Sequence, residues 1–252
     1  MVTKTRQTKA VTEYLERERS INLNILGYLG NFAEAEVYLY NDDLKNGLIV
    51  SGVVDGVEQD FFYLCTSFDD FLKEFWESLA PGHKCFSGVH APVARLFQKG
   101  KNVVWQNPCK VFVYNGGLER VEDSGCVCQS LTVEDAEEVD KYYTFRSDDS
   151  IHYIRENISR FDSACLRVDG QLAAWCCMHE DNSMGPLFTK EQHRKSKMAW
   201  AVTLALMEKL IAKRITPYVQ ILEDNAVSIG FAEKIKGMEY SHDCVWFGID
   251  KL

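Results

Sequence analysis

The residues most able to do chemistry in this chain stand where a polar, basic turn leads into a helix. Residues 185–199 begin as an apolar strand pattern, pass through the turn and continue into a long apolar helix pattern. The turn contains Arg194, Lys195 and Lys197. The first amides of a helix have no intrahelical partner, and the helix dipole places partial positive charge there. This arrangement is typical of a site for a pyrophosphate-sized anion, although the same residues also fit a solvated basic turn.

A second polar turn follows the strand pattern at 217–222. It carries Glu223 and Asp224, and the next residue, Asn225, is placed to cap the helix that begins there. Capping alone explains Asn225, so this turn indicates a ligand site only together with the first one.

The nine cysteines indicate neither a metal site nor a nucleophile. The Cys-x-Cys pair at 126–128, the Cys-Cys-x-His run at 176–179 and the His-x-Cys pair at 83–85 lack the two-pair spacing of a zinc site. We therefore expect no metal. Cys176 and Cys177 lie in an apolar pattern, where burial raises the pKa of a thiol, and we expect them to be packing residues.

Composition limits the classes of partner. The chain of 252 residues carries 28 basic and 37 acidic side chains, a net charge of -9, which disfavours binding to a nucleic-acid backbone. No apolar stretch approaches the roughly 18 residues of a membrane span, and the charged N-terminus does not have the pattern of a secretory signal. We expect a cytoplasmic protein with no membrane or nucleic-acid partner, either a monomer or a homodimer.

The hydrophobic pattern predicts a mixed α/β architecture in two halves. The turn Asp169-Gly170 between two apolar runs predicts a β-hairpin, and Thr132 is a candidate N-cap. In the first half we predict helices at 4–20 and 69–79 and strands at 23–28, 36–40, 47–54, 61–66 and 110–114. In the second half we predict helices at 151–160, 197–213 and 226–236 and strands at 165–168, 171–179, 184–189, 217–222 and 244–249.

Residues 163–240 resemble the GCN5-related N-acetyltransferase (GNAT) superfamily, and most closely its glycine N-acyltransferase-like, or FR47-like, branch. Leu172-Ala173-Ala174-Trp175 stands for the strand motif P-V-S-W of that branch, and 189–194 stands for the motif L-P-E-Y-R-G at the helix start. The downstream motif V-x-x-x-N-x-x-S/A is similar to Val219, in looser register, with Asn225 and Ser228. The order and spacing of these elements carry the resemblance more than any single residue.

The resemblance implies the acyl-CoA N-acyltransferase fold in two tandem GNAT-like domains, a degenerate one at 1–120 and a catalytic one at 126–252, meeting near 118–130. It implies that acetyl-CoA, or another short acyl-CoA, lies between the splayed strands 184–189 and 217–222. The acyl group would pass to the primary amine of a small molecule or amino acid by direct attack. The cofactor-binding residues that it implies are Leu187, Phe188, Thr189, Arg194, Lys195, Ser196, Lys197, Met198, Ala199, Asn225 and Ser228.

The chain departs from the family at three points. Lys195 and Lys197 replace the glycines of the phosphate-binding turn, and we expect them to need no positive φ at the start of a helix. Phe231 stands where a tyrosine often protonates the leaving thiolate. The usual glutamate base is missing, and Glu180 or Asp181 is the candidate catalytic substitute. These departures leave open an alternative: a catalytically weak or inactive GNAT-fold binding or regulatory module.

Overall fold

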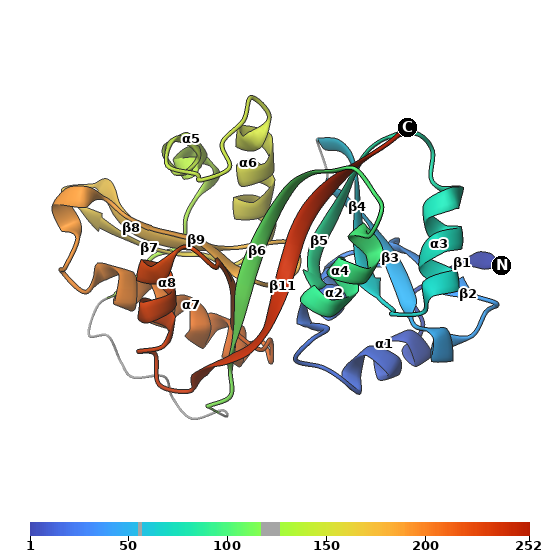
Figure 1. Ribbon diagram of the computed structural model, residues 1–252. Coiled ribbons are helices and arrows are strands. Elements are labelled where there is room, and N and C mark those ends of the chain that lie inside the picture. The colour runs from blue at the N-terminus through green and yellow to red at the C-terminus, as the bar shows by residue number, and fades with distance from the viewer. Residues whose placement is uncertain (55–56, 117–126) are drawn as a thin grey trace. The chain divides into compact units, whose positions relative to one another are not determined.

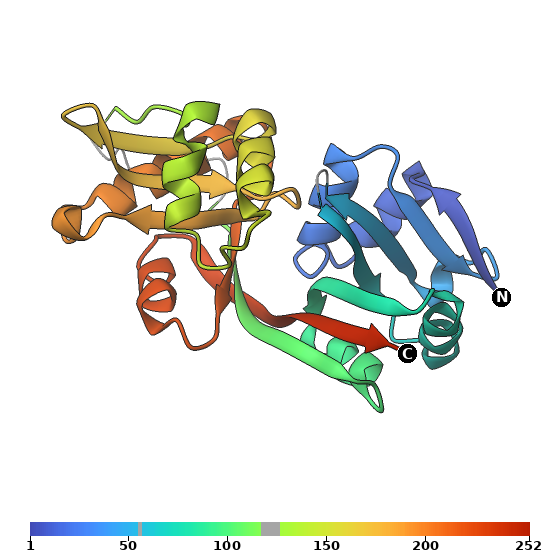
Figure 2. The ribbon, with the colours of Figure 1, turned by 90° about the horizontal axis from the view of Figure 1, so that it is seen from above.

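The computed structural model describes residues 1–54, 57–116 and 127–252, and its contacts divide the chain into two compact units. The first unit comprises Met1–Val54, Glu58–Val113 and Gln220–Leu252, and the second consists mainly of Tyr114–Val219. Both combine strands with helices, so the mixed α/β class is confirmed (Figures 1 and 2).

An eight-stranded sheet runs through the described part of the first unit in the order β1-β2-β3-β4-β5-β11-β6-β10. Its strands are β1 (Val2–Arg6), β2 (Glu36–Tyr40), β3 (Leu48–Val54), β4 (Val57–Cys65), β5 (Gly82–His90), β6 (Val103–Tyr114), β10 (Tyr218–Leu222) and β11 (Met238–Lys251). The helices of this part are α1 (Lys9–Glu16), α2 (Leu23–Asn31), α3 (Asp69–Ser78), α4 (Ala91–Gln98) and α8 (Ala226–Ala232), with the 3-10 turn η1 (Leu44–Asn46).

Aromatic side chains fill the core of the first unit. Phe71 and Phe75 of α3 and Phe97 of α4 pack with Phe86 of β5 and Phe247 of β11. The rings of Phe86 and Phe247 stack with their centroids 4.8 Å apart, and the two residues are partners in the antiparallel pairing of β5 with β11. The end of the chain therefore completes the sheet of the N-terminal half.

The division into domains 1–120 and 126–252 stays a prediction, because residues 117–126 at its junction lie outside the described residues. The strands predicted at 217–222 and 244–249 are present as β10 and β11. They join the eight-stranded sheet, however, and not the sheet of the predicted hairpin. Hydrophobic periodicity identifies a strand but does not identify its partner.

Of two predictions near the N-terminus, one is wrong in part and the other is wrong throughout. Residues 4–20 were expected to be one helix, but Val2–Arg6 form β1 and only Lys9–Glu16 are helical. Strand β1 pairs with β2, a contact over more than thirty positions that a local charge pattern does not reveal. Residues 23–28 were expected to be a strand and lie in helix α2, since a short apolar run fits a buried helix as well as a strand. The pattern also missed β5 and α4.

The second unit is built on a three-stranded antiparallel sheet in the order β7-β8-β9. Helices α5 and α6 cover one face of this sheet and α7 covers the other (Figure 1). Asp169 and Gly170 join β7 to β8 with φ values of 51° and 77°, the left-handed turn that their types predict. The elements are β7 (Ala164–Val168), β8 (Gln171–Met178), β9 (Met184–Thr189), α5 (Ala136–Lys141), α6 (Ser150–Arg160), α7 (Met198–Ala212), η2 (Val133–Asp135) and η3 (Glu191–His193).

Candidate functional site

Strand β9 is an edge strand whose only partner in the described chain is β8. The amide of Lys190, directly after β9, donates to the carbonyl of Ala173 at 2.9 Å. Because hydrogen bonds alternate along an antiparallel pair, the backbone groups of Leu187 and Thr189 point away from β8. Two of the sequence-predicted residues therefore present backbone donors and acceptors along the second edge of the sheet.

Thr189 carries a further polar group without a protein partner. Its hydroxyl oxygen Oγ1 is buried and makes no hydrogen bond within the described residues. The carbonyl of Thr189 accepts a long bond of 3.5 Å from Nε of Arg194. The neighbouring Phe188 faces the core instead, where its ring lies 5.0 Å from Trp175 and 4.6 Å from Tyr142.

The loop from β9 to α7 has the backbone shape of a glycine-containing turn, although it contains no glycine. After η3 the backbone is extended at Arg194, and it takes φ values of 64° at Lys195 and 65° at Lys197. The expectation that these lysines need no positive φ was wrong. Left-handed backbone costs a non-glycine residue about 1–2 kcal/mol, because Cβ approaches the carbonyl oxygen. The chain keeps this costly shape with lysine at both positions.

The amides of residues 195–199 have no acceptor in the described chain. Arg194, Lys195 and Lys197 are exposed and make no ion pair with a described residue. By contrast, Lys190 at the start of the loop is paired with Glu138 of α5. Exposed amides, a helix N-terminus and three cations without an ion pair among the described residues are the features that a site for a polyvalent anion requires.

Three further residues of this loop, which were predicted to bind the cofactor, have different side-chain roles. The hydroxyl of Ser196 donates to the carbonyl of His193 and so fixes the turn before α7. Met198 and Ala199 begin helix α7 with half-buried side chains, and their contribution to an anion site is limited to their amides.

Glu180 lies in the turn between β8 and β9 and is buried, with 7% of its surface exposed. Burial raises the pKa of its carboxyl group above the usual value; His179 opposes this shift, Asp181 adds to it, and the hydrogen bond from Tyr153 opposes it again. The hydroxyl of Tyr153 on α6 donates to Oε2 of Glu180 at 2.8 Å. A carboxylate whose pKa is raised toward neutrality has the property that a general base needs.

Asp181 is engaged in holding the turn. It is fully buried, and its Oδ1 accepts two bonds, one from the amide of Ser183 at 2.9 Å and one from the Ser183 hydroxyl at 2.6 Å. The hydroxyl of Tyr218 donates to the Asp181 carbonyl at 2.8 Å. Of the two predicted bases, the geometry favours Glu180.

Asn225 and Ser228 belong to the first unit. The side chain of Asn225 accepts a bond of 3.0 Å from the amide of Ser228, so the predicted cap of the following helix is confirmed. The role of both residues in holding a cofactor stays a prediction.

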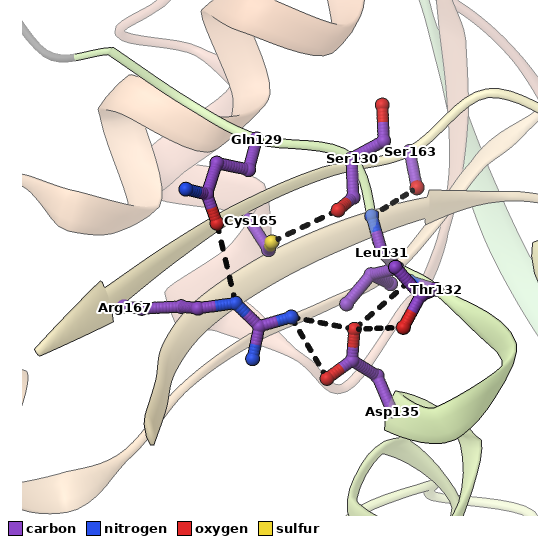
Figure 3. A network of polar contacts seen from close by, with 8 residues as sticks. All are labelled: Gln129, Ser130, Leu131, Thr132, Asp135, Ser163, Cys165 and Arg167. Atoms are coloured by element: carbon purple, nitrogen blue, oxygen red, sulfur yellow. Dashed lines mark hydrogen bonds and ion pairs between the residues drawn. The ribbon is translucent and has the colours of Figure 1, made fainter. Parts of the chain in front are cut away.

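The opposite edge of the small sheet is closed by a polar network (Figure 3). Gln129 forms an isolated bridge with Cys165 of β7, through mutual backbone bonds of 2.9 and 2.7 Å. The guanidinium of Arg167 donates to both carboxylate oxygens of Asp135 at 2.9 and 2.7 Å, and Asp135 accepts the amide of Thr132 at 2.9 Å. This confirms the predicted N-cap position of Thr132 at η2.

Three buried cysteines of the second unit are poor nucleophiles. Cys165, Cys176 and Cys177 are buried, and burial raises the pKa of each thiol, to about 12 for Cys176. The described residues contain no group of three metal ligands. None of the helices in the described ranges has the length and apolar character that a bilayer crossing requires.

Two residues beside Glu180 were missed as a functional group. Tyr153 contacts both Glu180 and His179, although 26 positions separate it from His179. The available signal was the adjacent pair His179-Glu180 at the end of an apolar strand, an unusual place for two titratable side chains. The partner on α6 could not be found from spacing.

Residues 164–247 match the family model described as FR47-like protein. A crystal structure of a Drosophila protein is similar, with a TM-score of 0.78, 14% identity and 98% of each chain covered. An acetyltransferase of the GNAT family from Colwellia psychrerythraea gives a TM-score of 0.53 at 14% identity, over 99% of this chain and 100% of that chain. A tandem GNAT protein from the clavulanic acid biosynthesis pathway gives 0.55 at 12% identity, over 99% of this chain and 98% of that chain. No curated protein matches the sequence.

Proposed function

From an FR47-like domain at residues 164–247 within a GNAT fold, we propose that this protein is an acyl-CoA-dependent N-acyltransferase. The acyl donor is acetyl-CoA or another short acyl-CoA. The observation that carries the proposal is the loop before α7. It has left-handed backbone at Lys195 and Lys197, the two glycine positions of the family turn, and unbonded amides at 195–199. Binding an anion would account for the cost of that backbone, for which the described residues show no other compensation.

The described residues fit a CoA thioester, which when bound supplies the acyl carbonyl and a thiolate leaving group. The amides of 195–199 with Arg194 would hold its pyrophosphate. The outward backbone groups of Leu187 and Thr189 would bind its extended arm as an added strand binds a sheet edge. One of these two amides would stabilise the carbonyl oxygen as negative charge develops there. The unpartnered hydroxyl of Thr189 is a further donor on the same strand.

The proposed reaction is direct attack of an amine, without an acyl-enzyme. The raised pKa values of Cys165, Cys176 and Cys177 argue against a cysteine nucleophile. Glu180, with its raised pKa, is the carboxylate that can finally hold the proton that the amine loses. Phe231 has no proton to give a departing thiolate. Water therefore protonates the thiolate, and the reaction is slower than in relatives with tyrosine.

The proposed acceptor is the primary amine of a small molecule or amino acid. The net charge of -9 disfavours a nucleic-acid partner, while the local cations of the loop suit a small phosphorylated donor. We further propose a cytoplasmic protein that acts without a membrane partner, as a monomer or homodimer.

One observation favours the alternative, a binding or regulatory module with little or no catalysis. The side chains of Lys195 and Lys197 stand where the family has none, and both are exposed at the loop where a phosphate would bind. This alternative predicts CoA binding without acyl transfer, so binding and turnover must be measured separately.

Isothermal titration with CoA tests the proposal directly. We expect wild type to bind CoA, and Arg194→Glu to weaken binding by at least about tenfold, since a phosphate contact becomes a repulsion. Lys99→Glu is the matched control: it makes the same charge change at an exposed residue in the first unit and should leave the affinity unchanged. Equal affinity of wild type and Arg194→Glu would show that the loop is not the CoA site.

Initial-rate kinetics test the mechanism. Direct transfer predicts a sequential pattern when acetyl-CoA and an amine are varied together. A ping-pong pattern, or a cysteine found acylated by mass spectrometry and turning over, would contradict direct attack.

A further inference from the structure

The hydroxyl of Tyr153 stands between two titratable side chains. It lies 2.6 Å from Nδ1 of His179 and 2.8 Å from Oε2 of Glu180. All three residues belong to the second unit, Tyr153 on α6 and the other two directly after β8. This cluster extends inward from His179, which is half-buried, to Glu180, which is buried.

The positions of the protons in this cluster follow from the number of hydrogen-bond donors that each side chain has. A tyrosine hydroxyl has one proton, and here it is donated to the Glu180 carboxylate, the acceptor that carries charge. The short contact to Nδ1 of His179 then requires that Nδ1 carry a proton and donate it to the tyrosine oxygen. In a neutral imidazole Nε2 is left as an acceptor.

That acceptor nitrogen lies against strand β9. A methyl group added to Gly185 would stand 3.0 Å from Nε2 of His179, so the imidazole edge is next to the backbone of this strand. Strand β9 is the edge strand with outward backbone groups at Leu187 and Thr189. The outer end of the cluster therefore lies beside the strand that the proposed function assigns to the acyl donor.

We propose that His179 is the residue that takes the proton of the amine acceptor, and that Tyr153 passes a proton on to Glu180. This inference rests on the proposed acyl transfer and names its proton acceptor. The N–H bond of the substrate ammonium breaks as Nε2–H forms, and Nδ1–H breaks as the tyrosine gains that proton. The tyrosine gives its own proton to Oε2 of Glu180. The imidazole ends neutral in its other tautomer, and the carboxylate ends protonated, so charge and protons balance.

The surroundings of Glu180 favour the state in which its carboxyl group has received the proton. Its titratable neighbours are Tyr153 from α6, Tyr143 from the segment before α6, and His179 and Asp181 on its own turn. Asp181 repels a second negative charge, while its own Oδ1 is occupied by Ser183. A proton arriving on Glu180 removes a buried charge, which is why this carboxylate can accept it.

The first test reads the tautomer of His179 and needs no substrate. Nitrogen-15 NMR of the histidine ring should show the Nδ1–H form in wild type at neutral pH, with His179→Gln used to assign the signal. In Tyr153→Phe the acceptor for Nδ1–H is lost, and the ring should shift toward the Nε2–H form. Tyr143→Phe removes the hydroxyl of a tyrosine whose ring centroid lies 6.2 Å from that of Tyr153; it is the matched control and should leave the tautomer unchanged. An Nε2–H tautomer in wild type overturns the relay.

The second test uses acetyl-CoA with two probe amines. Benzylamine is protonated at neutral pH and must lose a proton before attack, whereas trifluoroethylamine is already uncharged. For benzylamine we expect kcat to fall about 100-fold in His179→Gln and Tyr153→Phe, with KM for acetyl-CoA unchanged. We expect a much smaller loss with trifluoroethylamine. His152→Gln, at an exposed histidine next to Tyr153 on α6, is the control and should behave as wild type.

The outcomes separate the two proposals. Absence of CoA binding in wild type contradicts the acyltransferase function, while the tautomer measurement still decides the hydrogen-bond relay. If transfer occurs and both amines lose activity equally in Tyr153→Phe, or neither does, the relay is wrong and the acyltransferase function stands. Circular dichroism and melting curves of each variant identify any loss caused by misfolding.

Discussion

The two edges of the three-stranded sheet in the second unit differ in how their backbone groups are hydrogen-bonded. On the β7 edge, the backbone of Cys165 exchanges two hydrogen bonds with Gln129. The amide of Leu131 donates to the hydroxyl of Ser163 at 2.9 Å (Figure 3). Lys209 of α7 reaches the same segment through Ser130 Oγ at 2.8 Å. On the β9 edge, the described residues offer no strand to the outward groups of Leu187 and Thr189.

This difference indicates that one edge of the small sheet serves stability and the other serves function. An unpaired strand edge is a liability that proteins usually cover, as the Gln129–Asp135 segment covers β7. The β9 side instead collects unfavourable features: unbonded amides at 195–199, left-handed lysines, and the buried carboxylate of Glu180. Strain and unpartnered groups that persist in one place are typical of ligand sites. The contrast predicts that changes on the β7 side alter stability, and changes on the β9 side alter activity.

The largest expected effect is on transfer, from Leu187→Pro. Proline removes an amide that points away from β8, so the β8–β9 pairing keeps its bonds and the edge strand tolerates the residue. If that amide serves the acyl donor, the rate of acetyl transfer should fall about 100-fold, the usual cost of one lost carbonyl-oxygen donor. Steady-state kinetics with acetyl-CoA measures this.

The matched change on the other edge is Cys165→Pro. It removes an amide that donates to Gln129 at 2.7 Å, and it should lower the free energy of unfolding by at least about 1–3 kcal/mol. Should Leu187→Pro prove as destabilising as Cys165→Pro while its rate per folded molecule is unchanged, the two edges do not differ in role.

A smaller, purely structural effect is expected from Asp135→Ala. Asp135 accepts the amide of Thr132 and both bonds from Arg167, and it is 8% exposed. Its removal should lower the free energy of unfolding by about 2–3 kcal/mol, as measured in urea. The affinity of the folded protein for CoA should stay the same.

The control for Asp135 is Asp162→Ala, which breaks the ion pair with Lys213, where the lysine side chain is 59% exposed. Surface pairs contribute about 0–1 kcal/mol, so this loss should be the smaller one. A CoA affinity that falls with Asp135→Ala would mean that the β7 edge supports the ligand site after all.

The local structure on the β7 side of the small sheet could be predicted from the sequence better than the backbone on the β9 side, for a physical reason. Local signals determine local structure: the Asp169-Gly170 turn and the N-cap at Thr132 were predicted and are confirmed. Strand partners are set by contacts far apart in the chain, so the pairing of β11 with β5 and the existence of β1 could not be obtained from periodicity.

The basic turn before α7 was predicted in position but not in conformation, and its role as a site stays a prediction. The basic turn at 194–197 was located by its charges and by the helix that follows. Its left-handed backbone was not predicted, because glycine is the residue that signals positive φ and lysine stands there instead. Tyr153 was missed because the contact between α6 and the turn after β8 depends on how helix and sheet pack.

The strain on the β9 side can be measured by comparing glycine with alanine at one position. Lys195→Gly should be about 1 kcal/mol more stable than Lys195→Ala, since both lack the charge and only alanine has a Cβ at φ 64°. At Lys73, an exposed position inside helix α3, the order should reverse by about 1 kcal/mol. Urea unfolding of the four variants gives the comparison, and the same sign at both positions would show that residue 195 is not left-handed in solution.

The last and smallest effect concerns the pH dependence of stability at Glu180. Burial raises the pKa of this carboxyl group in the folded protein above its value in the unfolded chain. The folded protein therefore binds the proton more readily, and its stability falls as pH rises through the folded-state pKa. Glu180→Gln cannot ionise and should escape this fall. Below the unfolded pKa, wild type and variant should melt at similar temperatures, because both carry a neutral side chain. Above the folded pKa the variant should melt at the higher temperature, while acetyl transfer is lost.

Asp135→Asn supplies the contrast, because it replaces a carboxylate that has an ion-pair partner and should melt lower than wild type at neutral pH. Melting curves from pH 4 to pH 8 decide the matter, and a pH-independent difference at Glu180 would mean that this carboxylate is not held at a stability cost.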